Sequence, residues 1–121
     1  KLPHMLIDAF KSTLEVVAEA DLLLHVIDAD DPEAAEQLEV SQTVLVEIGA
    51  EDLPRHYVVN KIDLLKDGMA KDPELIPYLR SKSSPEEIHF TSALEGEGIV
   101  ELRDGLEQAC LQILAQRKVQ R

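Results

Sequence analysis

Two short polar motifs follow apolar runs in this sequence, and their residue types suit the recognition of a nucleobase. Asn60-Lys61-Ile62-Asp63 follows the β-rich run His56-Tyr57-Val58-Val59, and Thr91-Ser92-Ala93 follows Ile88-His89-Phe90. Ligands of parallel α/β sheets bind beyond the carboxyl ends of the strands, so both motifs are predicted to face one pocket. An isolated Asn-Lys-x-Asp also occurs in ordinary turns. The second motif, at the end of another strand, favours the binding role.

The chemistry of these side chains favours guanine. Guanine offers two parallel donors, at N1 and at its exocyclic amine, and the Asp63 carboxylate can accept both, whereas adenine presents an acceptor at N1. Lys61 can lay its methylene stem against the purine face. Asn60 can reach the N7 side of the base, and the backbone N–H of Ala93 suits the guanine carbonyl oxygen. The predicted guanine-binding residues are Asn60, Lys61, Asp63, Ser92, Ala93 and Leu94; no catalytic and no metal-ligating residue is predicted.

The elements that must position these motifs alternate between helix and strand. The nearly continuous apolar run 22–27 predicts a strand buried on both faces of a parallel sheet. Helices are predicted at 6–17, from the start signal Asp31-Pro32-Glu33 to about residue 48, and at 99–115. Segment 64–85 is predicted to be a surface excursion with at most one short helix. The predicted fold is α/β, with three parallel strands, flanking helices and an apolar edge on the first strand.

Composition limits the partners that this chain can bind directly. The 121 residues are enough for one domain, and the net charge of −12 comes from 24 acidic and 12 basic residues. That charge repels nucleic-acid phosphates, so no direct nucleic-acid binding is expected. No apolar run approaches the length of a membrane span. The single Cys110 cannot form an internal disulfide, which suits a reducing, cytoplasmic location.

Several stretches resemble one family of nucleotide-binding proteins. The two motifs resemble the fourth and fifth guanine-binding motifs of translation-factor-class GTPases. The stretches LPH at 2–4, AFKSTLE at 9–15, ADLLLHVID at 20–28 and SALEGEG at 92–98 resemble the HflX family. The resemblance covers essentially the whole chain. It implies that residues 1–121 are the C-terminal part of a GTP-binding (G) domain, from the second switch helix to the final helix, with a partial P-loop GTPase fold that lacks the N-terminal half-sheet.

The resemblance also implies an activity for the intact protein. It implies a GTPase that binds GTP and GDP with Mg²⁺, contacts the large ribosomal subunit and splits or rescues stalled ribosomes. The 121 residues contain no Gly-x-x-x-x-Gly-Lys-Ser/Thr phosphate loop. The magnesium-sensing Asp-x-x-Gly of the family would lie upstream of Lys1. The chain alone is therefore expected to lack the Mg²⁺ ligands and to be inactive in hydrolysis.

Two alternatives come from other classes of protein. A receiver-like signalling domain would be phosphorylated on a strand-end aspartate such as Asp28, with Thr91 or Ser92 as the switch hydroxyl. That interpretation lacks the paired acids of such domains and leaves Asn60 to Asp63 unexplained. A ligand-free acidic interaction module is the other alternative, and it predicts that no guanine nucleotide binds even to the intact protein.

Overall fold

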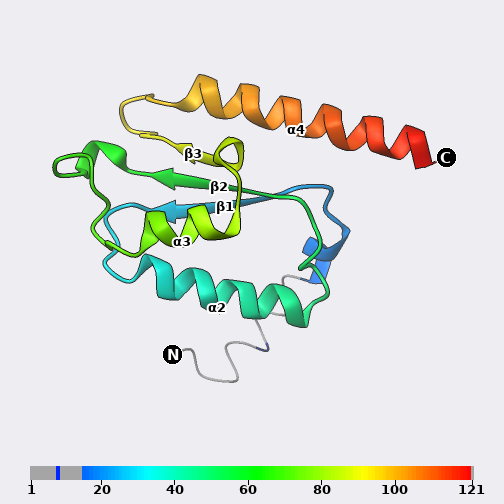
Figure 1. Ribbon diagram of the computed structural model, residues 1–121, viewed down its shortest axis with the longest axis horizontal. Helices are drawn as coiled ribbons and strands as arrows, with labels where there is room; N and C mark the ends of the chain where they lie inside the picture. The colour runs from blue at the N-terminus through cyan, green and yellow to red at the C-terminus, as the bar shows by residue number, and fades with distance from the viewer. Residues whose placement is uncertain (1–7, 9–14, 121) are drawn as a thin grey trace.

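A three-stranded parallel sheet with helices on both faces organises the chain in this computed structural model (Figure 1). The structure describes residue 8 and residues 15–120. The strands are β1 (Leu23–Asp28), β2 (Arg55–Asn60) and β3 (Ile88–Phe90), in the spatial order β1-β2-β3. The predicted α/β fold with three parallel strands is confirmed. The helix predicted at 6–17 lies almost wholly outside the described residues, and the 3-10 helix η1 spans Glu15–Glu19.

Three α-helices flank this sheet. Helix α2 (Ala34–Glu47) connects β1 to β2, α3 (Leu75–Lys82) precedes β3, and α4 (Ile99–Gln120) follows β3. Two further 3-10 turns, η2 (Ile62–Leu64) and η3 (Pro85–Glu87), lie after β2 and before β3. Helices α2 and α3 share one face of the sheet, and α4 runs beside β3 (Figure 1). Among the described residues, no helix is long and apolar enough to cross a membrane.

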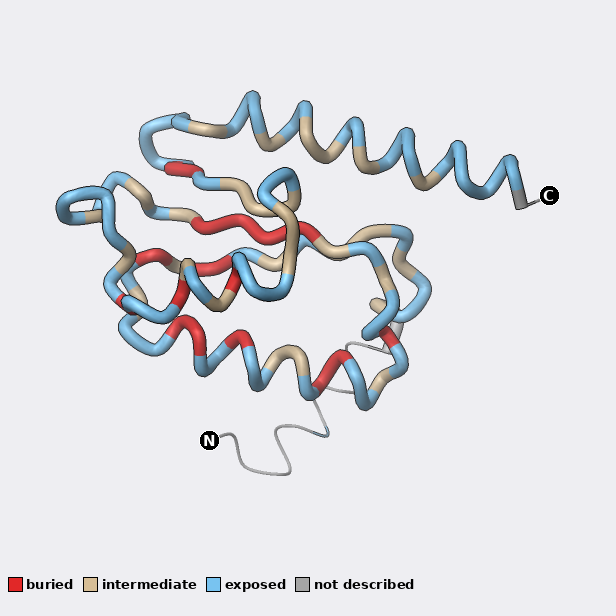
Figure 2. Tube along the Cα trace, viewed as in Figure 1, coloured by how far each residue is buried: buried red, intermediate tan, exposed pale blue. Residues whose placement is uncertain are grey.

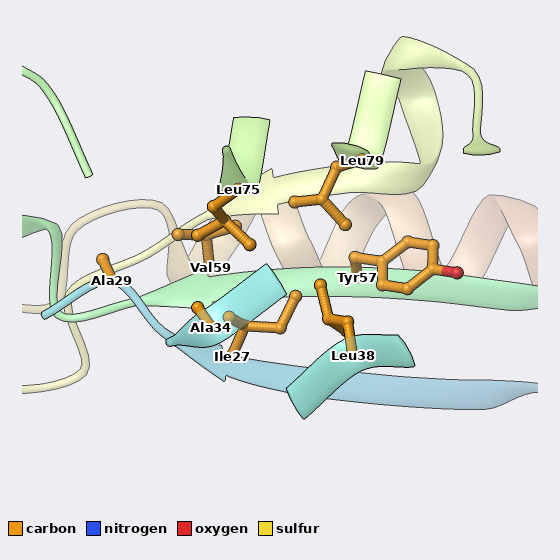
Figure 3. Close-up of a cluster of buried hydrophobic side chains, with 8 residues drawn as sticks. All are labelled: Ile27, Ala29, Ala34, Leu38, Tyr57, Val59, Leu75 and Leu79. Atoms are coloured by element: carbon orange, nitrogen blue, oxygen red, sulfur yellow. The ribbon is translucent and has the colours of Figure 1, made fainter. Parts of the chain in front are cut away.

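The main core lies between the sheet and helices α2 and α3. Leu75 and Leu79 of α3 are fully buried and point toward Val59 and Tyr57 of β2 (Figure 3). The core side chains are Ile27, Ala29, Ala34, Leu38, Tyr57, Val59, Leu75 and Leu79. The prediction that segment 64–85 contains at most one short α-helix is confirmed, and most of the segment is exposed as predicted, but Leu75 and Leu79 belong to the core. Two leucines four residues apart lie on the same helix face, which packs onto the sheet.

A buried aspartate joins the beginnings of α2 and α3. Asp72 accepts the Ala35 N–H at 2.9 Å through Oδ2 and the Glu74 N–H at 2.9 Å through Oδ1. Asp31, in the predicted start signal of α2, instead accepts the N–H of Glu33 at 2.8 Å. Helix α2 starts at Ala34, and one of the N–H groups in its first turn, that of Ala35, is bonded to Asp72 in a distant loop. The negative charge of Asp72 is also favourable at the positive end of the helix dipole.

The opposite face of the sheet is only partly covered. Leu24 and Val26 of β1 are 43% and 62% exposed, on the face away from the core residue Ile27. The predicted apolar edge on this strand is confirmed, but the prediction that both of its faces are buried was wrong. Helix α4 is exposed or partly exposed along its described length, and Cys110 on its predicted apolar side is exposed (Figure 2). In the described residues, α4 packs mainly against β3 rather than against β1.

Three histidines lie in the sheet and influence its stability. His56 Nδ1 lies 2.8 Å from His89 Nε2 with the rings stacked, and Gly105 lets α4 approach, because a Cβ there would lie 2.7 Å from His89 Cε1. Burial, and then the neighbouring His56, lower the pKa of His89. On the core face, His25 stacks on Tyr57, and burial, followed by the Arg55 charge, lowers the pKa of His25.

These shifts predict that the fold loses stability when the pH falls below the ordinary histidine pKa of about 6.5. The folded pKa lies below the unfolded value, so the stabilisation is present above the unfolded pKa and is lost as the pH falls through the folded pKa. Urea unfolding between pH 7.5 and pH 5.5 measures the slope. The variant His89→Gln should show a shallower loss than the wild-type chain, and equal slopes would contradict the prediction.

Candidate functional site

The side chain of Asn60 joins the two predicted motifs. Its Oδ1 accepts the Thr91 hydroxyl at 2.9 Å and the Ala93 backbone N–H at 3.0 Å. A backbone N–H can only donate, so the atom that faces Ala93 is the amide oxygen, and the amide NH₂ remains as a donor. Thr91 is 2% exposed, and its own backbone N–H donates to the Val59 carbonyl at 2.9 Å. The end of β3 is thereby held against the end of β2.

Lys61 turns the chain sharply at the end of β2. Its φ of 69° lies in the left-handed region, which costs a non-glycine residue about 1–2 kcal/mol. Its ammonium donates to Asp28 Oδ2 at 2.9 Å, across to the end of β1. The Ala29 N–H donates to the Asn60 carbonyl at 2.9 Å and extends the pairing of these strands. The loop at residues 60–63 is therefore tied to the ends of both neighbouring strands.

Asp63 lies in the turn η2 and is held by the second motif. Ser92 is fully buried, and its hydroxyl donates to Asp63 Oδ1 at 2.7 Å while accepting the Glu95 N–H at 3.1 Å. Main-chain bonds between Ser92 and Glu97, at 2.9 and 3.1 Å, close the loop that follows. The Asp63 side chain is exposed, and its carboxylate retains the capacity for further donors.

These contacts place the predicted residues near one another at the carboxyl ends of the strands. Asn60 is bonded to Ala93, Asp63 to Ser92, and Lys61 to Asp28, so this network consists of three separate side-chain groups at the carboxyl ends of β1, β2 and β3. Leu94 makes none of these bonds, and its side chain is 83% exposed. Among residue 8 and residues 15–120, no group of three His, Cys, Asp or Glu side chains could hold a metal ion.

The same contacts weigh against a receiver-like site. The two hydroxyls that could act as a switch are buried, with Thr91 donating to Asn60 and Ser92 donating to Asp63. Asp28 is engaged through both oxygens, by the Lys61 ammonium and by the Asp30 N–H at 2.8 Å. A phosphoryl group on Asp28 would have to displace both partners. The geometry favours a site built around Asp63 instead.

Two residues in this network are absent from the predicted site. Thr91 appears in the motif only as the neighbour of Ser92, yet its hydroxyl fixes the Asn60 amide. The sequence indicates Asp28 only as the phosphorylation site of the receiver-like alternative, and in the structure its Oδ1 accepts the Asp30 N–H. Its second oxygen pairs with Lys61. The position of Asp28 at the carboxyl end of a neighbouring strand was the available signal for its place beside the site.

Several relatives named GTPase HflX match this sequence. The chain is 40% identical to GTPase HflX of Akkermansia muciniphila over 118 residues, which is 96% of this chain and 25% of that protein. It is 58% identical to GTPase HflX of Caldanaerobacter subterraneus subsp. tengcongensis and 53% identical to that of Escherichia coli, each over 66 residues, or 54% of this chain. The chain spans 15–25% of the length of these three relatives. No family model matches the chain.

Two glycines in the loop before α4 provide a test of the loop geometry. Gly96 and Gly98 have nearly equal left-handed φ angles of 75° and 76°, but only at Gly98 would an added Cβ overlap the carbonyl oxygen of Phe90. We expect Gly96→Ala to cost about 1–2 kcal/mol of unfolding free energy from backbone strain alone. Gly98→Ala should cost about 1–3 kcal/mol more, because the end of β3 must shift. Equal losses in urea unfolding would refute this account of the loop.

Proposed function

Because the chain is homologous to part of GTPase HflX, we propose that it forms the base-recognising part of a GTP-binding domain. In this proposal residues 1–121 are the C-terminal part of the G domain, from the second switch helix to the final helix. The ligand is a guanine nucleotide, GTP or GDP. The observation that carries the proposal is the exposed Asp63 carboxylate, oriented by the buried Ser92 hydroxyl beside Asn60 and Ala93.

Asp63 supplies the specificity for guanine. One oxygen already accepts the Ser92 hydroxyl at 2.7 Å, which limits rotation of the carboxylate. The remaining lone pairs accept guanine N1–H and the exocyclic amine. Hydrogen bonds to a charged group contribute about 1.5–3 kcal/mol each, so adenine, which presents an acceptor at N1, is rejected strongly.

Asn60 and Ala93 bind the guanine N7 and the guanine carbonyl oxygen. With its oxygen turned toward Thr91 and Ala93, the Asn60 amide NH₂ is free to donate to guanine N7. The Ala93 N–H donates to Asn60 Oδ1 at 3.0 Å. When nucleotide binds, this N–H donates to the guanine carbonyl oxygen as well as to Asn60, or in place of Asn60. The Thr91 hydroxyl keeps Asn60 in place during this exchange. The exposed Leu94 and the stem of Lys61 contribute apolar contact area.

The intact protein is proposed to be a cytoplasmic GTPase that acts on the large ribosomal subunit and splits or rescues stalled ribosomes. The residues that hold the phosphates and Mg²⁺ lie outside this chain, because its sequence contains no phosphate loop. With a net charge of −12, the chain is a poor partner for RNA, so contacts with ribosomal RNA are assigned to other parts of the protein. Base contacts alone should give this chain only weak nucleotide binding.

The variant Asp63→Asn in the full-length protein tests the proposed function. Asparagine keeps one acceptor but places an amide NH₂ opposite the guanine amine, so GDP affinity should fall about 10- to 100-fold. Xanthosine diphosphate, which has a carbonyl where guanine has its amine, should bind more tightly than it does to the wild-type protein. Calorimetric titration with both nucleotides measures the change.

Asp52→Asn is the matched control for this experiment. Asp52 is exposed and precedes β2, so the variant removes the same charge at the opposite end of the strand. It should bind GDP as the wild-type protein does. An unchanged preference for guanine over xanthine in Asp63→Asn would rule out the assignment of Asp63.

A further inference from the structure

The carboxylate of Asp28 lies outside the predicted base-binding set, yet it makes a side-chain contact with Lys61 in that set. Its Oδ2 accepts the Lys61 ammonium at 2.9 Å. Its Oδ1 accepts the Asp30 backbone N–H at 2.8 Å, which fixes the rotamer of the aspartate within a tight turn. Asp28 is also the register partner of Asn60 across the β1–β2 pair. The carboxylate therefore has a defined position relative to the loop at residues 60–63.

A fixed partner such as Asp28 matters for Lys61 because the lysine side chain is long and about half exposed to solvent. Its side chain is 52% exposed, and a lysine stem with four rotatable bonds loses considerable conformational freedom when it is held in one orientation. The left-handed backbone at Lys61 sets the direction in which the stem leaves the loop. A fixed acceptor at the far end of the stem is what selects one rotamer.

From this geometry we propose that Asp28 is a positioning residue for guanine-nucleotide binding, which holds the ammonium of Lys61 so that the lysine stem lies ready along the face of the purine. The inference rests on the proposed function. Asp28 itself touches no nucleotide in this proposal and acts only through Lys61. The nucleotide then binds to a lysine that has already lost most of its rotational freedom, so less entropy is lost on binding.

The electrostatics of the pair agrees with this role. The hydrogen bond from Lys61, followed by that from the Asp30 N–H, lowers the pKa of Asp28, and the same contact with Asp28 raises the pKa of Lys61. Both groups are therefore charged at neutral pH. Exposed ion pairs usually contribute little to the stability of a fold, so the effect is expected in nucleotide affinity rather than in unfolding.

The test is a double-mutant cycle in the full-length protein with GDP as the probe. Asp28→Asn keeps an oxygen for the Asp30 N–H but turns an amide NH₂ toward the Lys61 ammonium, and it should raise the Kd for GDP about fivefold. Lys61→Met retains an apolar stem and removes the ammonium. In the Lys61→Met background, Asp28→Asn should have no further effect, because Asp28 acts through the ammonium alone.

Asp52→Asn is the matched control here as well, because it removes an equal charge from an exposed residue that precedes β2, at the opposite end of the strand. It should leave the Kd for GDP unchanged, and all variants should retain the unfolding midpoint of the wild-type protein. The inference is overturned if Asp28→Asn binds GDP like Asp52→Asn, or if its effect adds fully to that of Lys61→Met. If Asp63→Asn switches preference toward xanthine in either case, only the inference fails and the proposed function stands.

Discussion

The register of the parallel sheet determines where every polar group of the site lies. Asp28 pairs with Asn60 and Val59 pairs with Phe90, so the chains leaving β1, β2 and β3 begin their turns side by side. Val59, fully buried in the middle strand, holds this register through the main core. A shift of one residue would move the core side chains to the opposite face and separate the motifs, so the packing of the core and the geometry of the site depend on the same pairing.

Polar side chains at the strand ends satisfy one another and so build the site without a ligand. Thr91 and Ser92 are buried hydroxyls that would destabilise the fold if they lacked partners, and their partners are Asn60 and Asp63. The bonds that satisfy these hydroxyls also orient the amide and the carboxylate. Fold stability and preorganisation of the proposed base site therefore depend on the same few hydrogen bonds.

The face of the sheet opposite the main core is only half covered. Leu24 and Val26 remain exposed on the side where α4 packs mainly against β3. Apolar side chains at a sheet edge favour contact with another surface, and the HflX relatives are several times longer than this chain.

The sequence by itself determined the three strands, the helices after β1 and β3, and the two motifs at the strand ends, because period, turn residues and short-range spacing are local properties. Tertiary structure decided the rest. Leu75 and Leu79 are buried in the core. Asp72 accepts an N–H from the first turn of α2, and Asp28 accepts the Lys61 ammonium. Each of these contacts joins residues that are distant in sequence, and only the packing of α3 and the register of the sheet bring them together.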